Sequence, residues 1–249
     1  DTNYSDTTGT GMVAWNWKAG GAAVSNSDGD ITSSVSANTT AGFSIVSWTG
    51  SGTLDDTVGH GLGVTPSLFI FKAVTGSDNW PVWQESFGVD SNMYFDTTGA
   101  LYDGNQPDRF PTLPTPSVFT PGNAANIGGT GLAIITYCFH SVEGYSKVGK
   151  YTGNSSTDGT FVYTGFSPAY VMLKALGVGN WNIVDNKRDT YNPAAHYIYA
   201  NSTSVNSVST VLDFTSNGFK LRINDSYWNT DSIIYIAFAE SPFKTSNAR

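Results

Sequence analysis

The organisation of this chain is decided by the stretch Gly42–Gly50, which reads GFSIVSWTG. It recurs, with one inserted residue, as Gly144–Gly153, which reads GYSKVGKYTG. A further match follows in the same order, because Gly63–Pro66 corresponds to Gly165–Pro168. The matching residues keep offsets of 101 to 103 positions. Similarity at a fixed period is the signature of a repeated unit, so we interpret the chain as a duplication.

Two shorter matches carry this alignment further along the repeat. Lys72 corresponds to Lys174, and the Asn-Trp pair ending at Trp80 corresponds to the Asn-Trp pair ending at Trp181. Because these matches keep offsets of 102 and 101, we expect the two units to share their local structure as well as their length.

The last strand of the repeat occurs three times. Its copies are residues 12–17 (MVAWNW), 133–139 (AIITYCF) and 234–239 (IYIAFA). We therefore expect residues 1–18 to be the tail of an earlier repeat, and the chain to be a C-terminal piece of a longer protein. The predicted organisation is an N-terminal strand and connector over 1–41, a first repeat over 42–143 and a second repeat over 144–249.

The residue pattern inside each repeat predicts β-strands joined by turns. Phe219, Leu221 and Ile223 alternate with charged residues, which is the period of two expected of a half-buried strand. The continuous apolar run Ile233–Phe238 is typical of a central strand. Clusters of Gly, Asn, Asp, Ser and Thr between such runs favour turns. We predict an all-β protein of two antiparallel, jelly-roll-like sandwiches, with Gly20–Thr40 forming a connector that holds one edge strand.

Composition narrows the classes of function. The formal net charge is −8 and charged residues make up 13% of the chain, so a basic surface of the kind that binds nucleic acid is not expected. The longest apolar run, Ile233–Ala239, is far shorter than a membrane-spanning segment. No signal-peptide pattern follows Asp1, and the single cysteine, Cys138, cannot form an internal disulfide. We predict no nucleic-acid partner and no membrane insertion.

Acid pairs suited to catalysis are scarce in this sequence. Glutamate occurs three times, and hydrolysis of a glycosidic bond needs two carboxylates that face each other across a cleft. The candidate pairs are Asp55 with Asp56 and Asp185 with Asp189, and the second pair brackets Lys187 and Arg188. We interpret these residues as a salt-bridged turn, and we predict no catalytic residue.

Nucleophile and metal motifs are similarly weak. Cys138 and His140 are close enough in sequence to touch, but a buried thiol and a strand-end histidine explain them better. The three histidines lack the spacing of metal ligands. The run Asp28–Asp30 begins an EF-hand loop but does not complete one, which leaves a solvated turn or a surface Ca²⁺ site as alternatives. We predict no metal site and no cofactor.

Tryptophan beside polar turns is the feature that best suggests ligand binding. Trp80 and Trp181 each follow an asparagine directly after a turn, and Trp83 and Trp228 lie near polar loop residues. An exposed indole face can cover the apolar patch of a sugar while neighbouring amides bind its hydroxyl groups. Trp83 is the most informative, because Val184 stands at its place in the second repeat. These four residues are candidates for glycan binding. The alternative is that the repeat fold itself requires Trp80 and Trp181.

Several motifs also carry a resemblance to a known family. They are Val13–Gly21 (VAWNWKAGG), Cys138–Ser146 (CFHSVEGYS), Tyr151–Asn154 (YTGN) and Asp213–Phe219 (DFTSNGF). The chain from about residue 12 onward resembles a repeated domain in virion structural proteins of tailed bacteriophages, especially phages of cyanobacteria and marine bacteria. Gly42–Lys72 follows the pattern of that family closely. The family has no assigned activity and no catalytic residues to transfer.

The resemblance implies a component of the phage particle, such as a tail fibre or a surface appendage. The location implied is the virion surface, extracellular after host lysis. The partners implied are other virion proteins, host-surface glycans and further copies of the chain in a trimer. We expect a non-enzymatic virion structural protein that contributes to adhesion to the host surface. The alternatives are a purely architectural decoration or spacer domain, and a tailspike-type enzyme that degrades polysaccharide.

Overall fold

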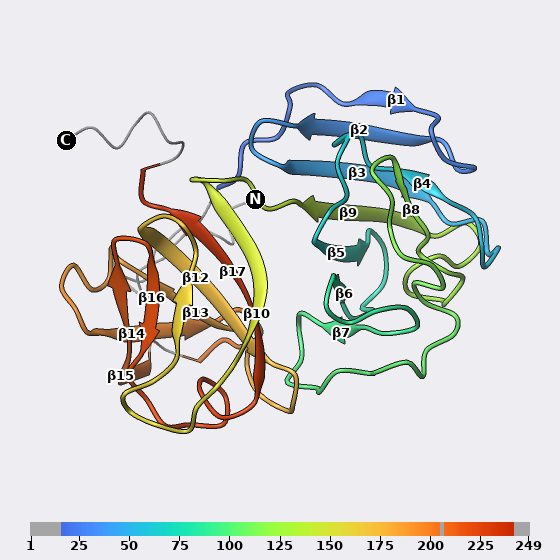
Figure 1. Cartoon of the computed structure of the whole chain (residues 1–249). Coiled ribbons are helices and arrows are strands. Elements are labelled where there is room, and N and C mark those ends of the chain that lie inside the picture. Colours follow the sequence, from blue (N-terminus) through green and yellow to red (C-terminus); the bar gives the residue numbers. More distant parts are fainter. Residues whose placement is uncertain (1–15, 205–206, 242–249) are drawn as a thin grey trace, which may run out of the picture.

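The computed structural model describes residues 16–204 and 207–241 (Figure 1). The regular elements within these ranges are β-strands, and all pairs of strands within the sheets are antiparallel. No helix capable of crossing a membrane is present in this part of the chain. The prediction of an antiparallel all-β protein is confirmed.

The N-terminal half is built on a seven-stranded sheet in the order β1-β2-β3-β9-β5-β6-β7. Its strands are β1 (Val24–Asn26), β2 (Ser33–Asn38), β3 (Phe43–Thr49), β5 (Leu68–Ala73), β6 (Pro81–Gln84), β7 (Met93–Tyr94) and β9 (Ala133–Phe139). A two-stranded sheet of β4 (Val58–Gly59) and β8 (Val118–Phe119) packs over one face. Phe119 lies there 5.0 Å from Phe69 and 6.1 Å from Trp48, measured between ring centroids.

The C-terminal half is one eight-stranded sheet in the order β10-β17-β12-β13-β14-β15-β16-β11. Its strands are β10 (Ser146–Thr152), β11 (Phe161–Tyr163), β12 (Pro168–Ala175), β13 (Asn182–Asp185), β14 (Ala194–Tyr199), β15 (Ser207–Thr215), β16 (Gly218–Leu221) and β17 (Ser232–Ala239). The sheet curls into a nearly closed barrel (Figure 1). Phe219 fills its interior against Tyr151 and Tyr235.

The two halves share much of their strand order. The run β3-β9-β5-β6-β7 in the first half matches β10-β17-β12-β13-β14 in the second, and the pair β4-β8 matches β11-β16. Strand register agrees as well, because Leu68 pairs with Phe139 just as Tyr170 pairs with Phe238. The difference is β15, which links the two parts of the C-terminal sheet. The correspondence found in the sequence is therefore also a correspondence of strand order.

In both halves a glycine lies in the turn just before the first strand of this shared order. Gly42 and Gly144 have φ angles of 63° and 74°, a left-handed conformation that other residues rarely adopt. A Cβ atom on Gly42 would also lie 2.6 Å from the carbonyl oxygen of His140. The repeated glycine is therefore required by the turn into β3 and β10.

The connector is more regular than predicted. Residues 24–38 contribute two strands rather than one, because β2 pairs with β3 over Ser34–Asn38 and β1 forms the edge beyond it. Val35 is buried on β2, which gives this polar segment an apolar anchor. The predicted strand 12–17 lies mostly outside the described residues, and Asn16 and Trp17 are not in a strand.

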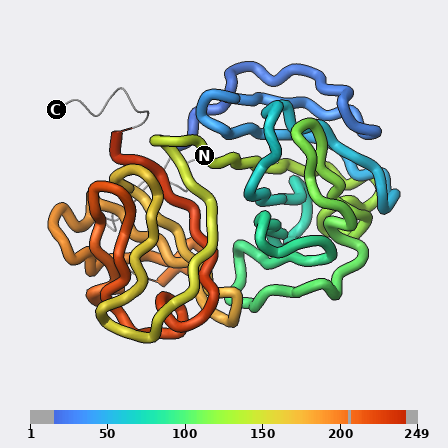
Figure 2. The backbone as a smooth tube through the Cα atoms, in the orientation of Figure 1, coloured from blue at the N-terminus to red at the C-terminus, as the bar shows by residue number. Residues whose placement is uncertain are grey.

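Strand β17 explains how the halves join. Ile233, Tyr235 and Ala237 face the interior of the C-terminal sheet, whereas Ile234 and Ile236 face the N-terminal half. A strand buried on both faces needs a continuous apolar sequence, as the run over these residues predicted. One hydrophobic core therefore extends from the N-terminal half across the junction, and a second lies inside the C-terminal sheet. Figure 2 shows the two halves side by side, blue to green and yellow to red.

Candidate functional site

Aromatic side chains meet where the two sheets face each other. Trp17, Phe139 and Phe238 form a three-ring cluster, with centroids 6.1 Å apart for Trp17 and Phe139 and 5.4 Å apart for Trp17 and Phe238. Phe139 and Phe238 complete the cluster at 6.3 Å. Each ring comes from the end of one copy of the thrice-repeated strand motif. Equivalent residues of three sequence copies therefore pack against one another.

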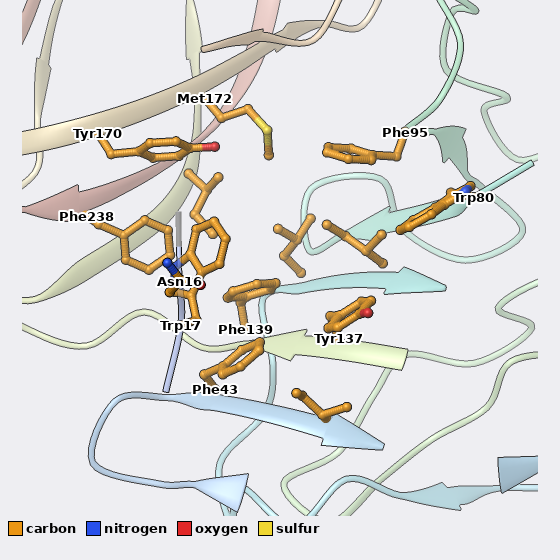
Figure 3. Close-up of a pocket in the computed structure, with 14 residues that line it drawn as sticks. Asn16, Trp17, Phe43, Trp80, Phe95, Tyr137, Phe139, Tyr170, Met172 and Phe238 are labelled. Carbon is orange, nitrogen blue, oxygen red and sulfur yellow. The ribbon is translucent and has the colours of Figure 1, made fainter. Parts of the chain in front are cut away.

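An apolar cavity of about 360 Å³ opens beside this cluster, and we call it the junction pocket (Figure 3). Strands of both halves line it. Its lining residues are Asn16, Trp17, Phe43, Ile45, Leu68, Ile70, Trp80, Phe95, Tyr137, Phe139, Tyr170, Met172, Ile236 and Phe238. Such a volume matches the lower range of small-molecule sites, but the lining supplies few polar groups to orient a ligand.

Three of the four tryptophan candidates are buried. Trp83 is 2% exposed and donates its indole N–H to the carbonyl of Gly88. Trp228 is 3% exposed and packs edge-on against Tyr197 at 4.9 Å. Trp181 is 2% exposed. A buried ring offers no face to a sugar, so these three residues are part of the packing and not a surface platform.

Trp80 is the candidate that stays accessible. It is half-buried and lines the junction pocket. The ammonium group of Lys72 lies over its ring, 5.4 Å from the centroid. Phe95 packs beside it at 6.3 Å. The structure thus separates Trp80 from Trp181, although the sequence places them at equivalent positions.

The acid pair of the sequence lies in a turn, where each carboxylate has its own partner. Asp185 accepts hydrogen bonds from the backbone N–H groups of Lys187 and Arg188 and from the guanidinium of Arg188, at 2.8 to 3.0 Å. The predicted salt-bridged turn is confirmed for these residues. Asp189 instead binds the ring of His196 at 2.7 Å and the backbone N–H groups of His196 and Ala195.

These hydrogen bonds set the ionisation of Asp189. Burial alone would raise the pKa of this carboxyl, but the hydrogen bonds from His196 and Ala195 outweigh burial and lower the pKa below its usual value. A carboxyl group held in this way is already deprotonated near neutral pH, so it has no proton to donate as a general acid.

A second cavity, the polar pocket, lies next to this turn and has a volume of about 290 Å³. Its lining combines carboxylate, amide, hydroxyl and ammonium groups with one aromatic ring. The lining residues are Ser167, Pro168, Asn186, Lys187, Asp189, Thr190, Asn192, Phe214 and Glu240. The side-chain oxygen of Asn186 is buried here with no hydrogen-bond partner among the described residues. This chemistry suits hydroxyl-rich ligands better than the junction pocket does.

The cysteine and the histidines are in structural positions. Cys138 is fully buried, and burial raises the pKa of its thiol to about 12, so the reactive thiolate is suppressed. The His140 ring contacts the carbonyl of Thr65 at 2.9 Å, as a strand-end histidine would. Within residues 16–204 and 207–241, no three His, Cys, Asp or Glu side chains form a group that could hold a metal ion.

A family model described as a domain of unknown function, DUF7483, matches residues 1–242. The chain belongs to the DUF7483 family. No curated protein and no solved structure matches it.

The sequence of this DUF7483 chain did not predict the polar pocket. Ser167 and Glu240 meet Asn186 and Asp189 there because β12 begins at the same end of the sheet at which β13 and β17 finish. The backbone N–H of Glu240 donates to the carbonyl of Ser167 at 2.9 Å, which closes that edge. A signal was present in the cluster of polar residues over 185–192, but its partners are about 20 and 50 positions away.

Proposed function

We propose that this chain is a non-enzymatic structural protein of a tailed-phage virion, built from tandem jelly-roll-like β-sandwich repeats over 42–143 and 144–249. The family resemblance in the sequence supports the virion setting. The shared strand order supports the repeats. The location proposed is the particle surface, in a tail fibre or other appendage, with other virion proteins as partners.

The observation that carries this proposal is the aromatic junction. The core of the N-terminal half continues through Phe139 and Tyr170 into the facing strands of the C-terminal half. Burial of large rings on both faces resists relative movement of the two halves. A particle component exposed outside the cell has to keep its shape without disulfides, and this junction supplies the needed stiffness.

The positions of the tryptophans favour a purely architectural role over a role in adhesion. Trp83, Trp181 and Trp228 stabilise the interior, so stacking of sugars on these rings does not support adhesion. If the chain binds host glycans, the polar pocket is the better candidate. Its lining places amide, hydroxyl, carboxylate and ammonium groups beside the ring of Phe214, which is the combination of groups that binds sugar hydroxyls and an apolar sugar face.

The enzyme alternative rests on two carboxylates in the polar pocket. Asp189 and Glu240 both line it. Asp189 has both oxygens engaged in hydrogen bonds and a lowered pKa, and Glu240 lies 3.7 Å from the ammonium of Lys187. Glycoside hydrolysis needs one carboxyl that keeps its proton near neutral pH. This pair therefore supports binding better than hydrolysis.

Immunogold electron microscopy tests the virion role directly. Antibodies raised against the 249-residue chain are expected to label intact particles of the phage that encodes it, at one fixed place on the particle. Absence of label from intact and from detergent-opened particles, with the chain present in infected cells, would contradict the proposal.

Binding to isolated host-surface polysaccharide separates adhesion from architecture. For an adhesin we expect binding that weakens at least about tenfold in Asn186→Ala, which is about 1.4 kcal/mol, and stays unchanged in Asn79→Ala on an exposed turn. Release of soluble oligosaccharide would overturn the non-enzymatic assignment. Absence of polysaccharide binding by the unmodified chain and by both variants would support the purely architectural role.

A further inference from the structure

Each copy of the thrice-repeated strand motif brings an aromatic ring to the junction between the halves. Phe139 and Phe238 occupy equivalent positions, because they pair with Leu68 and Tyr170 in the same register. Trp17 ends the first copy of the motif. The centroids of the three rings form a triangle with sides of 5.4, 6.1 and 6.3 Å. The three copies therefore bring the same motif position to one place.

The motif position two residues earlier lines the junction pocket in the second and third copies. Tyr137 precedes Phe139 on β9, and Ile236 precedes Phe238 on β17, and all four residues line the pocket. Side chains two residues apart on a strand point to the same face, which explains why each pair shares the pocket. In the first copy this position is Trp15, which lies outside the described residues. The motif therefore predicts a third side chain for the same pocket.

The described chain leads from the wall of the pocket directly to this residue. Asn16 and Trp17 both line the pocket (Figure 3). The carbonyl of Lys18 accepts a hydrogen bond from the side-chain amide of Asn38 at 3.0 Å, which ties the chain to β2 immediately after the pocket. Because Trp15 is joined to Asn16 by a peptide bond, the two Cα atoms are about 3.8 Å apart. The Trp15 side chain is therefore within reach of the pocket.

The segment and the pocket match in chemistry and in size. Gly11–Trp15 reads GMVAW and carries no charged side chain, and the nearest charged residue before it is Asp6. The described residues that line the pocket are uncharged as well. A cavity of about 150 Å³ holds a benzene molecule, so the junction pocket, with about 360 Å³, has room for an indole ring. The family match includes these residues, so the segment is part of the shared domain.

We propose that residues 12–15 of the same chain occupy the junction pocket, with the side chain of Trp15 inserted beside Tyr137 and Ile236. The insertion removes apolar surface of the ring and of the lining from water, and it adds the third copy of the motif to the core between the halves. This inference goes beyond the proposed function and is independent of the virion role. An external apolar molecule then enters the pocket only by displacing the segment.

The affinity of Nile red for the full chain measures whether the pocket is occupied from within. The dye competes with the segment, so its apparent affinity is reduced by the fraction of molecules in which the pocket is open. Trp15→Ala is expected to raise the dye affinity at least about fivefold. Trp15→Phe keeps a smaller ring and should raise it less. The matched control Tyr4→Ala changes an aromatic residue of the same segment outside the motif and should leave the affinity unchanged.

The methyl resonances of methionine locate the effect of Trp15→Ala in the structure. Met172 lines the pocket, whereas Met93 is fully buried on β7 and is not among the lining residues. An inserted indole ring changes the magnetic field at the Met172 methyl group. In methyl-labelled full chain, Trp15→Ala should therefore shift the Met172 resonance and leave the Met93 resonance in place. An unchanged Met93 resonance also establishes that the variant is folded.

Two results would overturn insertion within one chain. The first is a folded Trp15→Ala variant whose dye affinity equals that of Tyr4→Ala, or whose Met172 resonance does not move, which would leave an external apolar molecule as the occupant. The second is a mean mass that rises with concentration in sedimentation of the unmodified chain but not of Trp15→Ala, which would assign the inserted segment to a second copy. If Trp15→Ala does not fold, the same measurements on Trp15→Phe decide.

Discussion

The indole N–H of Trp181 donates a 2.9 Å hydrogen bond to the backbone carbonyl of Tyr94, which lies in the other half of the chain. The bond is partly buried and the Trp181 ring is 2% exposed, so loss of the indole leaves the Tyr94 carbonyl without this partner in a place that water reaches poorly. Trp80 occupies the same place in the repeat and makes no such contact across the junction. The difference between these two tryptophans is the basis of the first prediction.

Trp181→Ala is expected to lower the free energy of unfolding by about 3–5 kcal/mol, because it opens a cavity and frees the Tyr94 carbonyl. The matched variant Trp80→Ala should cost less than about 2 kcal/mol, because its ring is already partly in water. Urea unfolding followed by circular dichroism measures both. Equal losses in the two variants would show that the junction does not distinguish them.

Because Lys174 is buried, we expect the free energy of unfolding to rise between pH 8 and 10. Burial lowers the pKa of its ammonium from 10.5 to about 8, so below pH 8 the folded protein holds a charge that burial disfavours. Between pH 8 and 10 the unfolded chain binds more protons at this position than the folded protein, and the free energy of unfolding should rise by up to about 3 kcal/mol. Urea midpoints over this range check the slope.

Lys174→Met supplies the control for that experiment, because it fills similar space without a titrating group. Its stability should show no such rise between pH 8 and 10. From about pH 9 the buried tyrosines act in the opposite direction, since burial raises the pKa of Tyr235 to about 12 and the unfolded chain loses its phenolic protons first. A slope that persists in Lys174→Met would assign the effect to another group.

The junction pocket should take up a neutral apolar dye such as Nile red in the folded protein, because its lining is mostly aromatic and aliphatic. Ile45→Asp puts a carboxylate into the lining and is expected to reduce dye fluorescence several-fold. Val24→Asp on the edge strand should leave it unchanged. Thermal melts of both variants establish that they are folded, and equal fluorescence in the two would show that the dye binds elsewhere.

Cys138 should be inert in the folded state. Its side chain is fully buried and the raised pKa of about 12 keeps the thiol protonated, so iodoacetamide at pH 8 should label it only after unfolding. The labelling rate is then expected to increase with urea in step with the unfolding curve. Rapid labelling in the absence of urea would contradict the burial of this strand.

Much of the fold could be predicted from local sequence. Strands β3, β5, β9, β12 and β17 carry apolar runs or alternation, and Gly42 and Gly144 mark the turns that precede the first repeated strand. The salt-bridged turn at Asp185 was predictable for the same reason, because its donors lie within three residues. Strand β2 was harder to identify, since Val35 is a single apolar residue among Ser and Ala.

The candidate site could not be predicted in the same way. Trp83 and Trp228 looked accessible because polar residues flank them, but the rings turn inward to meet Phe69 and Tyr197. The polar pocket joins Ser167 to Glu240, and the spacing of these residues carries no signal. Side-chain direction depends on which face of a strand another layer covers, and that layer comes from distant sequence.

The sequence by itself determined the all-β class, the correspondence of motifs between the two halves and the turns, because strand period, glycine conformation and recurring motifs are local properties of the chain. Tertiary structure alone decided which of two equivalent residues is buried. Trp181 packs under Tyr94 and Phe95 and Lys174 is fully buried, whereas Lys72 and Trp80 are only half-buried. The physical reason is that residues 94–101 of the N-terminal half hydrogen-bond to Leu176, Gly179 and Trp181 of the C-terminal half, so identical local sequences end in different environments.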